Sequence, residues 1–183
     1  TDDNTAAFQE ALDYANNKKI SEVYVPRGCY RFTGHLDVPA GMTLKGSYGS
    51  IPSHPGSGQK PEPNGDGTFL MPTEGRDNES GAPFITVNAN ALLRGMVIFY
   101  PDQKCDQDTP SPYPYSVKLQ GDNPSIQDVE LLNSYNGIQA INAGRHYIAR
   151  IQGQPLNIGL YVDETYDICL LYTSDAADDR LRV

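Results

Sequence analysis

The hydrophobic pattern changes its period within the first thirty residues. The spacing of Phe8, Leu12 and Ala15 predicts a helix over residues 4–16. From Val23 onward, apolar and polar positions alternate in short runs separated by turns that contain glycine or proline, which predicts β-strands. A helix with one apolar stripe, placed before a series of short strands, is expected to cap the open end of a stack.

Turn-like residues recur through the second half of the chain at a regular spacing. The turns begin at Asn88, Gly121, Asn142 and Asp163, with spacings of 33, 21 and 21 residues. A period near 20 residues is typical of a solenoid, and short strands between polar turns favour a β-solenoid. The predicted fold is therefore all-β, a single-stranded parallel β-helix of about 21 residues per coil with an N-terminal capping helix. Apolar residues keep step with the turns, as Val87, Leu119, Ile141 and Val162 just before them and Leu93, Ile126, Ile148 and Ile168 just after.

Three segments interrupt this regular pattern. They run from Ser47 to Gly67, from Thr73 to Gly81 and from Phe99 to Tyr115, and the last accounts for the 12 extra residues in the first spacing. Insertions in a solenoid leave the coil at turns and often build the binding face. We therefore expect the ligand-facing wall at these segments.

The opening of the chain resembles a known family. The chain carries the runs TDDNTAAFQEALDYA, VYVPRGCYRF, LDVPAG and MTLKGSYG, and residues 1 to about 46 are similar to the N-terminal cap and first coils of the rhamnogalacturonase/epimerase-like domain of the pectate-lyase superfamily. Later runs, such as LLRGMVIFYPDQ and RHYIARIQGQPLNIGLYVDETYDI, are similar to members related to glycoside hydrolase family 28. The resemblance implies a right-handed parallel β-helix.

The same resemblance implies what the protein acts on. It predicts a secreted, periplasmic or cell-surface protein that degrades a pectin-like or related polysaccharide by glycosidic hydrolysis or β-elimination. The alternative is a glycan-binding tailspike or adhesin without catalytic activity, because the superfamily scaffold supports both. The expected oligomeric state is a monomer, or a trimer if the chain is a tailspike.

Both ends of the sequence predict that it is part of a longer protein. Residues Cys169 to Asp178, CLLYTSDAAD, match the in-frame translation of a transposase sequencing-library adapter, so 169–183 are predicted to be non-native and 1–168 to be the natural portion. The opening Thr1 lies inside a motif whose relatives carry residues upstream. We therefore expect catalytic carboxylates in coils after Ile168, and this portion alone to be inactive.

The net charge of the chain limits which kinds of partner are expected. The formal net charge is −9, or −8 without residues 169–183, and no cluster of Lys and Arg is visible. This balance argues against nucleic acid and anionic membranes as partners. The sequence also lacks an apolar run of about 18 residues, which a membrane-spanning helix would need.

The candidate catalytic residues are Asp102, His146 and Asp163. A glycosidase needs two carboxyl groups about 5–10 Å apart, and a β-helix could supply them from successive coils. No pair of acidic residues falls in register, because Asp128 is expected opposite Gly95 and Ala149 and Asp163 opposite Asn142. Structural roles therefore compete with the catalytic one, and Asp163 also suits a turn cap.

The candidate substrate-binding residues are Tyr100, Tyr113, Tyr115 and Arg145. The three tyrosines flank the insertion that ends at position 115, and tyrosine rings can stack on sugars while their hydroxyls form hydrogen bonds. Packing of the loop against the coil is the competing interpretation. Arg145 could bind a uronate carboxylate, beside His146 as a proton-transfer group.

Cofactors and disulfides are not expected. Asp102, Asp106 and Asp108 could ligate Ca²⁺, but this loop lacks the glycine of a shaped calcium loop, so a solvated acidic loop is favoured and no metal is predicted. Cys29 and Cys105 lie far apart in the sequence, and their spacing does not establish a pair.

Overall fold

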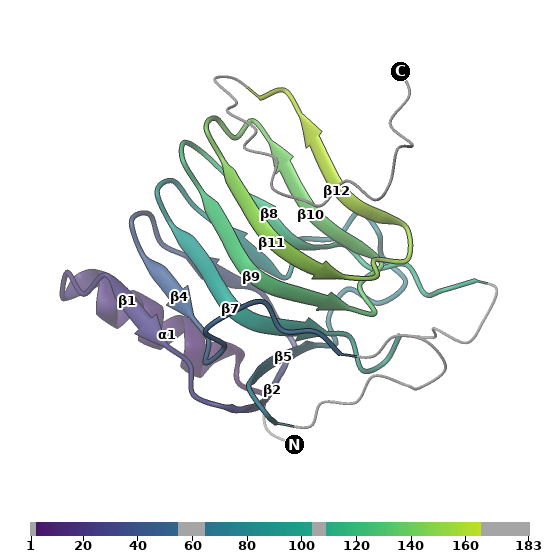
Figure 1. Cartoon of the computed structure of the whole chain (residues 1–183), viewed down its shortest axis with the longest axis horizontal. Helices are drawn as coiled ribbons and strands as arrows, with labels where there is room; N and C mark the ends of the chain where they lie inside the picture. Colours follow the sequence, from purple (N-terminus) through teal and green to yellow (C-terminus); the bar gives the residue numbers. More distant parts are fainter. Residues whose placement is uncertain (1–2, 55–64, 104–108, 166–183) are drawn as a thin grey trace.

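Short strands follow one another in coils that stack along a single axis (Figure 1). The computed structural model describes residues 3–54, 65–103 and 109–165. Ile168, predicted to continue an apolar column, and residues 169–183, predicted to derive from an adapter, lie outside these ranges. The described elements are the helix α1 (Thr5–Asn17) and the strands β1 (Glu22–Tyr24), β2 (Gly28–Phe32), β3 (Leu36–Val38), β4 (Thr43–Lys45), β5 (Thr68–Pro72), β6 (Ile85–Val87), β7 (Leu92–Phe99), β8 (Tyr115–Leu119), β9 (Ser125–Leu132), β10 (Asn136–Ile141), β11 (Tyr147–Gly153) and β12 (Ile158–Asp163).

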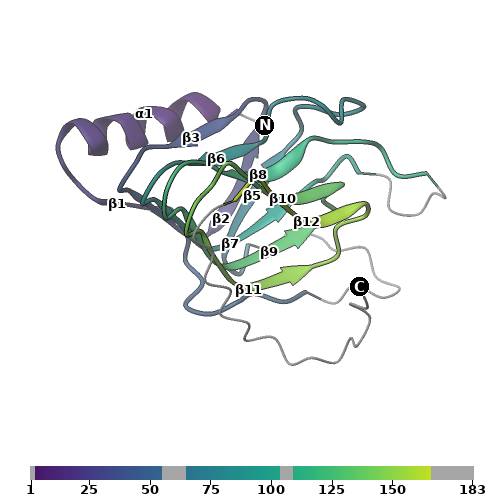
Figure 2. The ribbon, with the colours of Figure 1, turned by 90° about the horizontal axis from the view of Figure 1, so that it is seen from above.

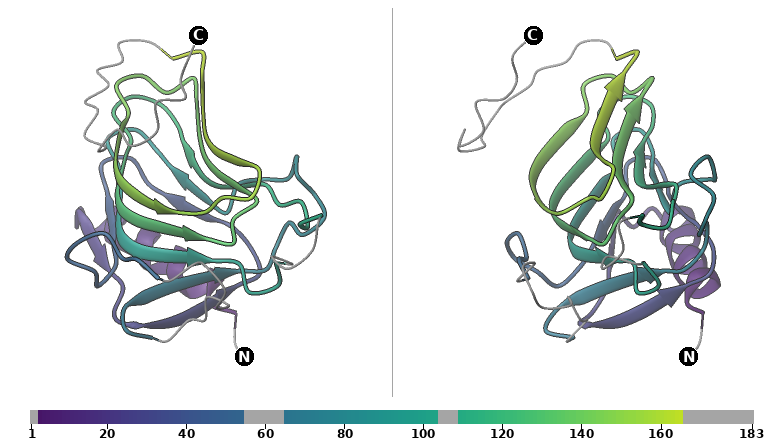
Figure 3. Two further views of the ribbon diagram at one scale, coloured as in Figure 1. Left: turned by 45° about the vertical axis from the view of Figure 1, so that its right-hand side comes forward. Right: turned by 90° about the vertical axis from the view of Figure 1, so that its right-hand side faces the viewer.

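The strands form two parallel sheets, here called sheet A and sheet B. Sheet B has the order β12-β10-β8-β6-β3. Sheet A has the path β1-β4-β7-β5-β2, and in addition β9 pairs with β7 and β11 pairs with β9. The long strand β7 pairs with β4 along its first half and with β5 along its second half. The predicted all-β parallel β-helix is therefore confirmed, and Figure 3 shows its coils stacked from the purple N-terminal end to the yellow β12.

The predicted capping helix is also confirmed, one residue further along than expected. α1 buries Leu12 and Ala15 and lies beside β3 and β1 (Figure 2). The Asp3 carboxylate accepts hydrogen bonds from the Thr5 amide at 3.0 Å and from the Thr33 amide at 3.0 Å. These bonds satisfy one free amide at the helix start and tie it to the end of β2.

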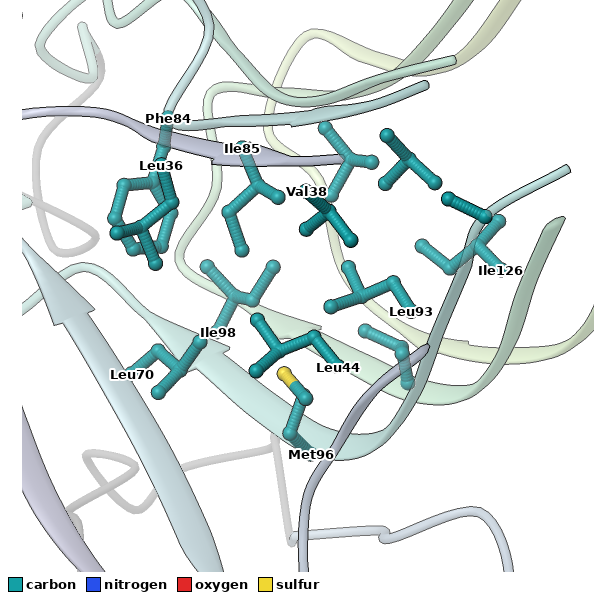
Figure 4. Close-up of a cluster of buried hydrophobic side chains, with 14 of the residues drawn as sticks. Leu36, Val38, Leu44, Leu70, Phe84, Ile85, Leu93, Met96, Ile98 and Ile126 are labelled. Carbon is teal, nitrogen blue, oxygen red and sulfur yellow. The ribbon is translucent and has the colours of Figure 1, made fainter. Parts of the chain in front are cut away.

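Alternate residues of every coil point into a common core. Leu44, Leu93 and Ile126 occupy one column of successive coils and are fully buried, with the neighbouring side chains shown in Figure 4. Burial of apolar side chains contributes roughly 1.5–3 kcal/mol for each large residue. This column is the one that the sequence repeat predicts.

The register differs from the sequence prediction by one residue in sheet B. Val87 and Leu119 align as expected, but Ala140, and not Ile141, continues the column to Val162. Asp163 consequently lies opposite Ile141 instead of Asn142. The coil from β10 to β12 is one residue longer than the coil from β8 to β10, so a strict period fails here.

A second correction concerns sheet A. Gln127 pairs with Ala149 and Val129 with Ile151, so Asp128 lies opposite Arg150 and not opposite Ala149. Asp128 and Arg150 both have a positive φ, as does Gly95 in the coil before. This left-handed column bends each long strand where its first half meets its second half.

Among the described residues, α1 is too short and too polar to cross a membrane as a helix.

The close approach of successive coils predicts a glycine requirement at position 46. A Cβ atom on Gly46 would overlap the carbonyl oxygen of Gly95 in the next coil, whereas a Cβ on Gly49 would meet no atom within 4 Å. Gly46→Ala is expected to lower the free energy of unfolding by about 1–3 kcal/mol, because the backbone must shift. Urea unfolding measures the loss, and an equal loss in Gly49→Ala would contradict this explanation.

Candidate functional site

The outer face of sheet A carries basic residues in an otherwise acidic chain. Lys45 and Arg94 are paired residues of β4 and β7, and Arg150 lies on β11. We call Lys45, Arg94 and Arg150 the basic strip. Lys45 Nζ also lies 3.5 Å from the Glu22 carboxylate, so the strip is partly neutralised at its β4 end. Adjacent strands of a sheet are about 4.8 Å apart, so the strip extends along the solenoid axis over four coils, from β4 to β11.

Asp128 lies inside this strip and holds its two arginines. Its side chain is fully buried, and it accepts hydrogen bonds from Arg150 Nε at 2.5 Å and Arg150 Nη2 at 2.6 Å. Arg94 Nε lies 3.3 Å from the same carboxylate. Two cations share one anion, so the group keeps a net positive charge.

These contacts change the ionisation of Asp128. The hydrogen bonds from Arg150, and then the charges of Arg150 and Arg94, hold the pKa of the Asp128 carboxyl below its usual value, against the opposing effect of desolvation. The arginine side chains remain accessible, at 36% for Arg94 and 50% for Arg150. A guanidinium has five N–H donors, so donors remain for a further anion.

An exposed aromatic ring lies beside the strip. Tyr147 starts β11 and is 40% exposed, and it is close enough to influence the charge of Arg150. A tyrosine ring offers a flat apolar surface together with a hydroxyl. The ring and the guanidinium therefore provide the two kinds of contact that an acidic sugar needs.

The segment 47–54 covers the second half of sheet A. Its Tyr48 amide donates to the Gly95 carbonyl at 3.1 Å, and Tyr48 packs on a small apolar cluster that contains Phe69 and Val97. At its far end, Ser53 Oγ accepts a hydrogen bond from Gln152 Nε2 at 2.6 Å. Figure 1 shows this dark-blue segment crossing in front of the lower strands. The described start of the first predicted insertion therefore lies on sheet A next to the basic strip, and its role as a ligand-facing wall stays a prediction.

A buried carboxylate holds this segment in place. Glu130, on β9, is 1% exposed and accepts hydrogen bonds from the His54 amide at 2.8 Å and from His54 Nδ1 at 2.5 Å. His54 Nε2 lies 3.7 Å from the Asp66 carboxylate. The Tyr48 hydroxyl donates to the same Asp66 carboxylate, and burial, followed by this bond, raises the pKa of Tyr48. A buried acid, an imidazole and a half-exposed acid thus lie in a row.

Two of the predicted substrate-binding tyrosines lie in the core. Tyr100 and Tyr113 are at most 1% exposed, and their ring centroids are 4.9 Å apart in an edge-to-face arrangement. Burial raises the pKa of Tyr113 to about 12. Their packing matches the competing interpretation, in which the rings fix the loop to the coil. Substrate contact by these two rings stays a prediction, and their burial does not support it.

The other predicted binding residues are separated from one another. Tyr115 is partly buried at the start of β8 in sheet B. Arg145 is exposed in the turn before β11, with a positive φ. His146 is 5% exposed, and its Nδ1 lies 3.0 Å from the Ala143 carbonyl oxygen, so its ring lies inside the turn. The substrate-binding and proton-transfer roles of these residues stay predictions.

The two acidic catalytic candidates, Asp102 and Asp163, are at the surface. Asp102 is exposed in the loop after β7, whereas Asp106 and Asp108, considered with it for Ca²⁺, lie outside the described residues. Asp163 is exposed and accepts hydrogen bonds from the Glu164 amide and the Tyr161 hydroxyl, as a turn-capping residue does. The described part of the chain contains no group of three or more His, Cys, Asp or Glu that could hold a metal ion.

Cys29 is a free, exposed cysteine, and Cys105, considered as its partner, lies outside the described residues.

Sequence reasoning missed the groups that the structure brings together. His54 and Glu130 are 76 positions apart, and His54 lies in an insertion that has no periodicity. Asp128 and Arg150 are 22 positions apart, which a search at the predicted period passes over. Only Arg94 and Arg150 could have been singled out from the sequence, because they are basic residues in an acidic chain.

The protein is thus a parallel β-helix with a basic strip and an exposed aromatic ring on one sheet face. The family model described as rhamnogalacturonase A/epimerase, pectate lyase-like matches residues 1–148, and the chain belongs to this family. No curated protein and no solved structure gave a significant match. The family confirms the resemblance seen in the opening motif and indicates a polysaccharide as the partner.

The position of Asp128 predicts a pH-dependent loss of stability on substitution. Because its folded-state pKa is lowered, the carboxylate stabilises the fold above the unfolded-state pKa of about 3.9 and loses this effect as the pH falls through the folded-state value. Asp128→Asn should therefore lower the free energy of unfolding by about 1–3 kcal/mol at pH 7, and by less near pH 3.

Urea unfolding at the two pH values measures this difference, with the exposed residue Asp163 substituted to Asn as the control. A loss in Asp128→Asn that is the same at both pH values would contradict the assignment.

Proposed function

We propose that the protein cleaves a pectin-like polysaccharide by β-elimination along the outer face of sheet A. This proposal replaces the expectation of catalytic carboxylates after Ile168, because it uses residues of the described coils. The observation that carries the proposal is the pair of half-exposed arginines, Arg94 and Arg150, held by the buried carboxylate of Asp128. The family supports a carbohydrate-active protein, and the basic strip supports a uronate-containing chain as the substrate.

The arginines are suited to the carboxylate of a uronic acid. A guanidinium binds a carboxylate through two parallel N–H donors, and such charge-assisted bonds are roughly twice as strong as neutral ones. Asp128 fixes both side chains before the substrate arrives, which reduces the entropy lost on binding. Tyr147, exposed beside Arg150, provides a surface for the apolar side of a sugar ring.

Two observations favour elimination over hydrolysis. The positive charges of Arg94 and Arg150, placed beside the uronate carboxylate, make the C–H bond next to that carboxylate more acidic. Removal of this proton starts the elimination. Hydrolysis needs one carboxyl group to protonate the leaving oxygen and another to activate water or attack the sugar. Asp128 and Glu130 are both buried and engaged in hydrogen bonds to cationic or imidazole partners, so neither is free for those roles.

We also propose that the protein acts outside the cytoplasm. Pectin-like polymers are too large to enter a cell, so a protein that cleaves them acts as a secreted, periplasmic or cell-surface protein.

Substitution of Arg150 tests substrate binding. Arg150→Gln should raise KM for polygalacturonate about 10-fold or more, because a charge-assisted hydrogen bond contributes about 1.5–3 kcal/mol. The matched control is Lys118→Gln, since Lys118 lies on β8 in the opposite sheet. Cleavage is followed by the ultraviolet absorbance of unsaturated uronates and, in parallel, by new reducing ends.

The substrates distinguish the possible outcomes. Polygalacturonate and rhamnogalacturonan are expected to be cleaved and the neutral β-glucan is not. Reducing ends without ultraviolet absorbance would identify a hydrolase. Saturable binding of these polymers with no cleavage would contradict the proposal and identify a glycan-binding tailspike or adhesin.

A further inference from the structure

We propose that His54 is the catalytic base of this reaction and that Glu130 is the residue that positions it. This inference rests on the proposed β-elimination, and it assigns a proton-transfer role to a residue in the segment 47–54. The assignment comes from three observations, namely the partner of the imidazole at Nδ1, the half-exposed carboxylate near its Nε2, and the position of Glu130 beside Asp128 on β9.

Glu130 fixes the orientation and tautomer of the His54 ring. The carboxylate accepts a hydrogen bond from Nδ1 at 2.5 Å and a second from the His54 backbone amide at 2.8 Å. A carboxylate accepts and does not donate, so Nδ1 carries a proton, and the form of His54 that can act as a base is the one with its lone pair at Nε2. A buried carboxylate bound to one nitrogen of an imidazole is the arrangement by which enzymes orient a histidine base.

The second nitrogen, Nε2, lies 3.7 Å from the carboxylate of Asp66. The His54 side chain is 11% exposed and that of Glu130 is 1% exposed, whereas Asp66, 3.7 Å from Nε2, is 50% exposed. After Nε2 has taken a proton, the imidazolium lies between two carboxylates. Both carboxylates stabilise the positive charge that forms in the transition state.

The carboxylates that hold the base and the arginines of the basic strip lie on one strand. Glu130 follows Asp128 by two positions on β9, which corresponds to about 7 Å along the strand. Because Asp128 holds Arg94 and Arg150 and Glu130 holds His54, a uronate bound by the two arginines lies on the face of sheet A that also carries His54.

The chemical step conserves atoms and charge. His54 Nε2 takes the proton from the carbon next to the uronate carboxylate. The electron pair of that C–H bond forms the new C=C bond, and the C–O bond to the neighbouring sugar breaks. The leaving oxygen takes a proton from water, and the proton on His54 later returns to solvent, so neither an oxidant nor a reductant is needed.

Kinetics of a His54 variant tests the role directly. His54→Ala should lower kcat on polygalacturonate by about 100-fold or more, the range expected for loss of a general base, with KM within about 2-fold of the original protein. The acidic limb of the kcat profile against pH should disappear with it. The matched control is His35→Gln, because His35 is exposed and its Nδ1 lies beside the Pro83 carbonyl oxygen, away from the segment 47–54.

A second variant separates positioning from catalysis. Glu130→Gln retains a hydrogen-bond acceptor but loses the charge, so it should lower kcat less than His54→Ala and shift the acidic limb of the pH profile. Circular dichroism melting curves establish that each variant is folded. In the original protein, nitrogen chemical shifts of the His54 ring should report the Nδ1–H tautomer near pH 8, independently of turnover.

The outcomes distinguish this inference from the proposed function. Cleavage by the original protein with an unchanged kcat in folded His54→Ala would overturn the assignment of His54 and leave the proposed function standing. No cleavage of any uronate polymer by the original protein would overturn both. An Nε2–H tautomer for His54 would overturn the positioning role of Glu130.

Discussion

Backbone pairing between successive coils of sheet A places every residue of the candidate site. β7, β9 and β11 are joined in parallel register along nearly their whole length, and this register puts Arg150 of one coil beside Asp128 of the coil before. The bend at Gly95, Asp128 and Arg150 then separates an accessible first half of the sheet from a second half covered by the segment 47–54. The solenoid core holds this register, because a shift by one residue would turn its buried side chains outward.

Two buried carboxylates hold the charged side chains of the site in place on this scaffold. An unpaired buried carboxylate would be costly, so Asp128 and Glu130 each need a cationic or hydrogen-bonding partner. Asp128 obtains one by fixing two arginines, and Glu130 obtains one by fixing His54 and, through it, the end of the segment 47–54. The same requirement that stabilises the fold thus sets the positions of the cation, the imidazole and this segment.

The sequence predicts the scaffold better than the site. Column residues such as Leu93, Ile126 and Ile148 recur visibly, and the helix stripe around Leu12 is clear, so the β-helix and its cap follow from periodicity. The coil from β9 to β11 is one residue longer than the predicted period, which hides the contact between Asp128 and Arg150. The contact between His54 and Glu130 depends on how an insertion folds back over the sheet, and no local pattern encodes that path. The rings of Tyr100 and Tyr113, which flank an insertion in the sequence, pack inward because the coil provides an apolar site for them.

The most direct test of the central claim is a titration with a galacturonate oligomer, followed by nuclear magnetic resonance. If the ligand binds the outer face of sheet A, the chemical shifts of the side chains of Arg94, Arg150 and His54 should change. Lys118 and Tyr161, on sheet B, should remain unaffected. Shift changes confined to sheet B, or none at a saturating concentration of the oligomer, would contradict the account.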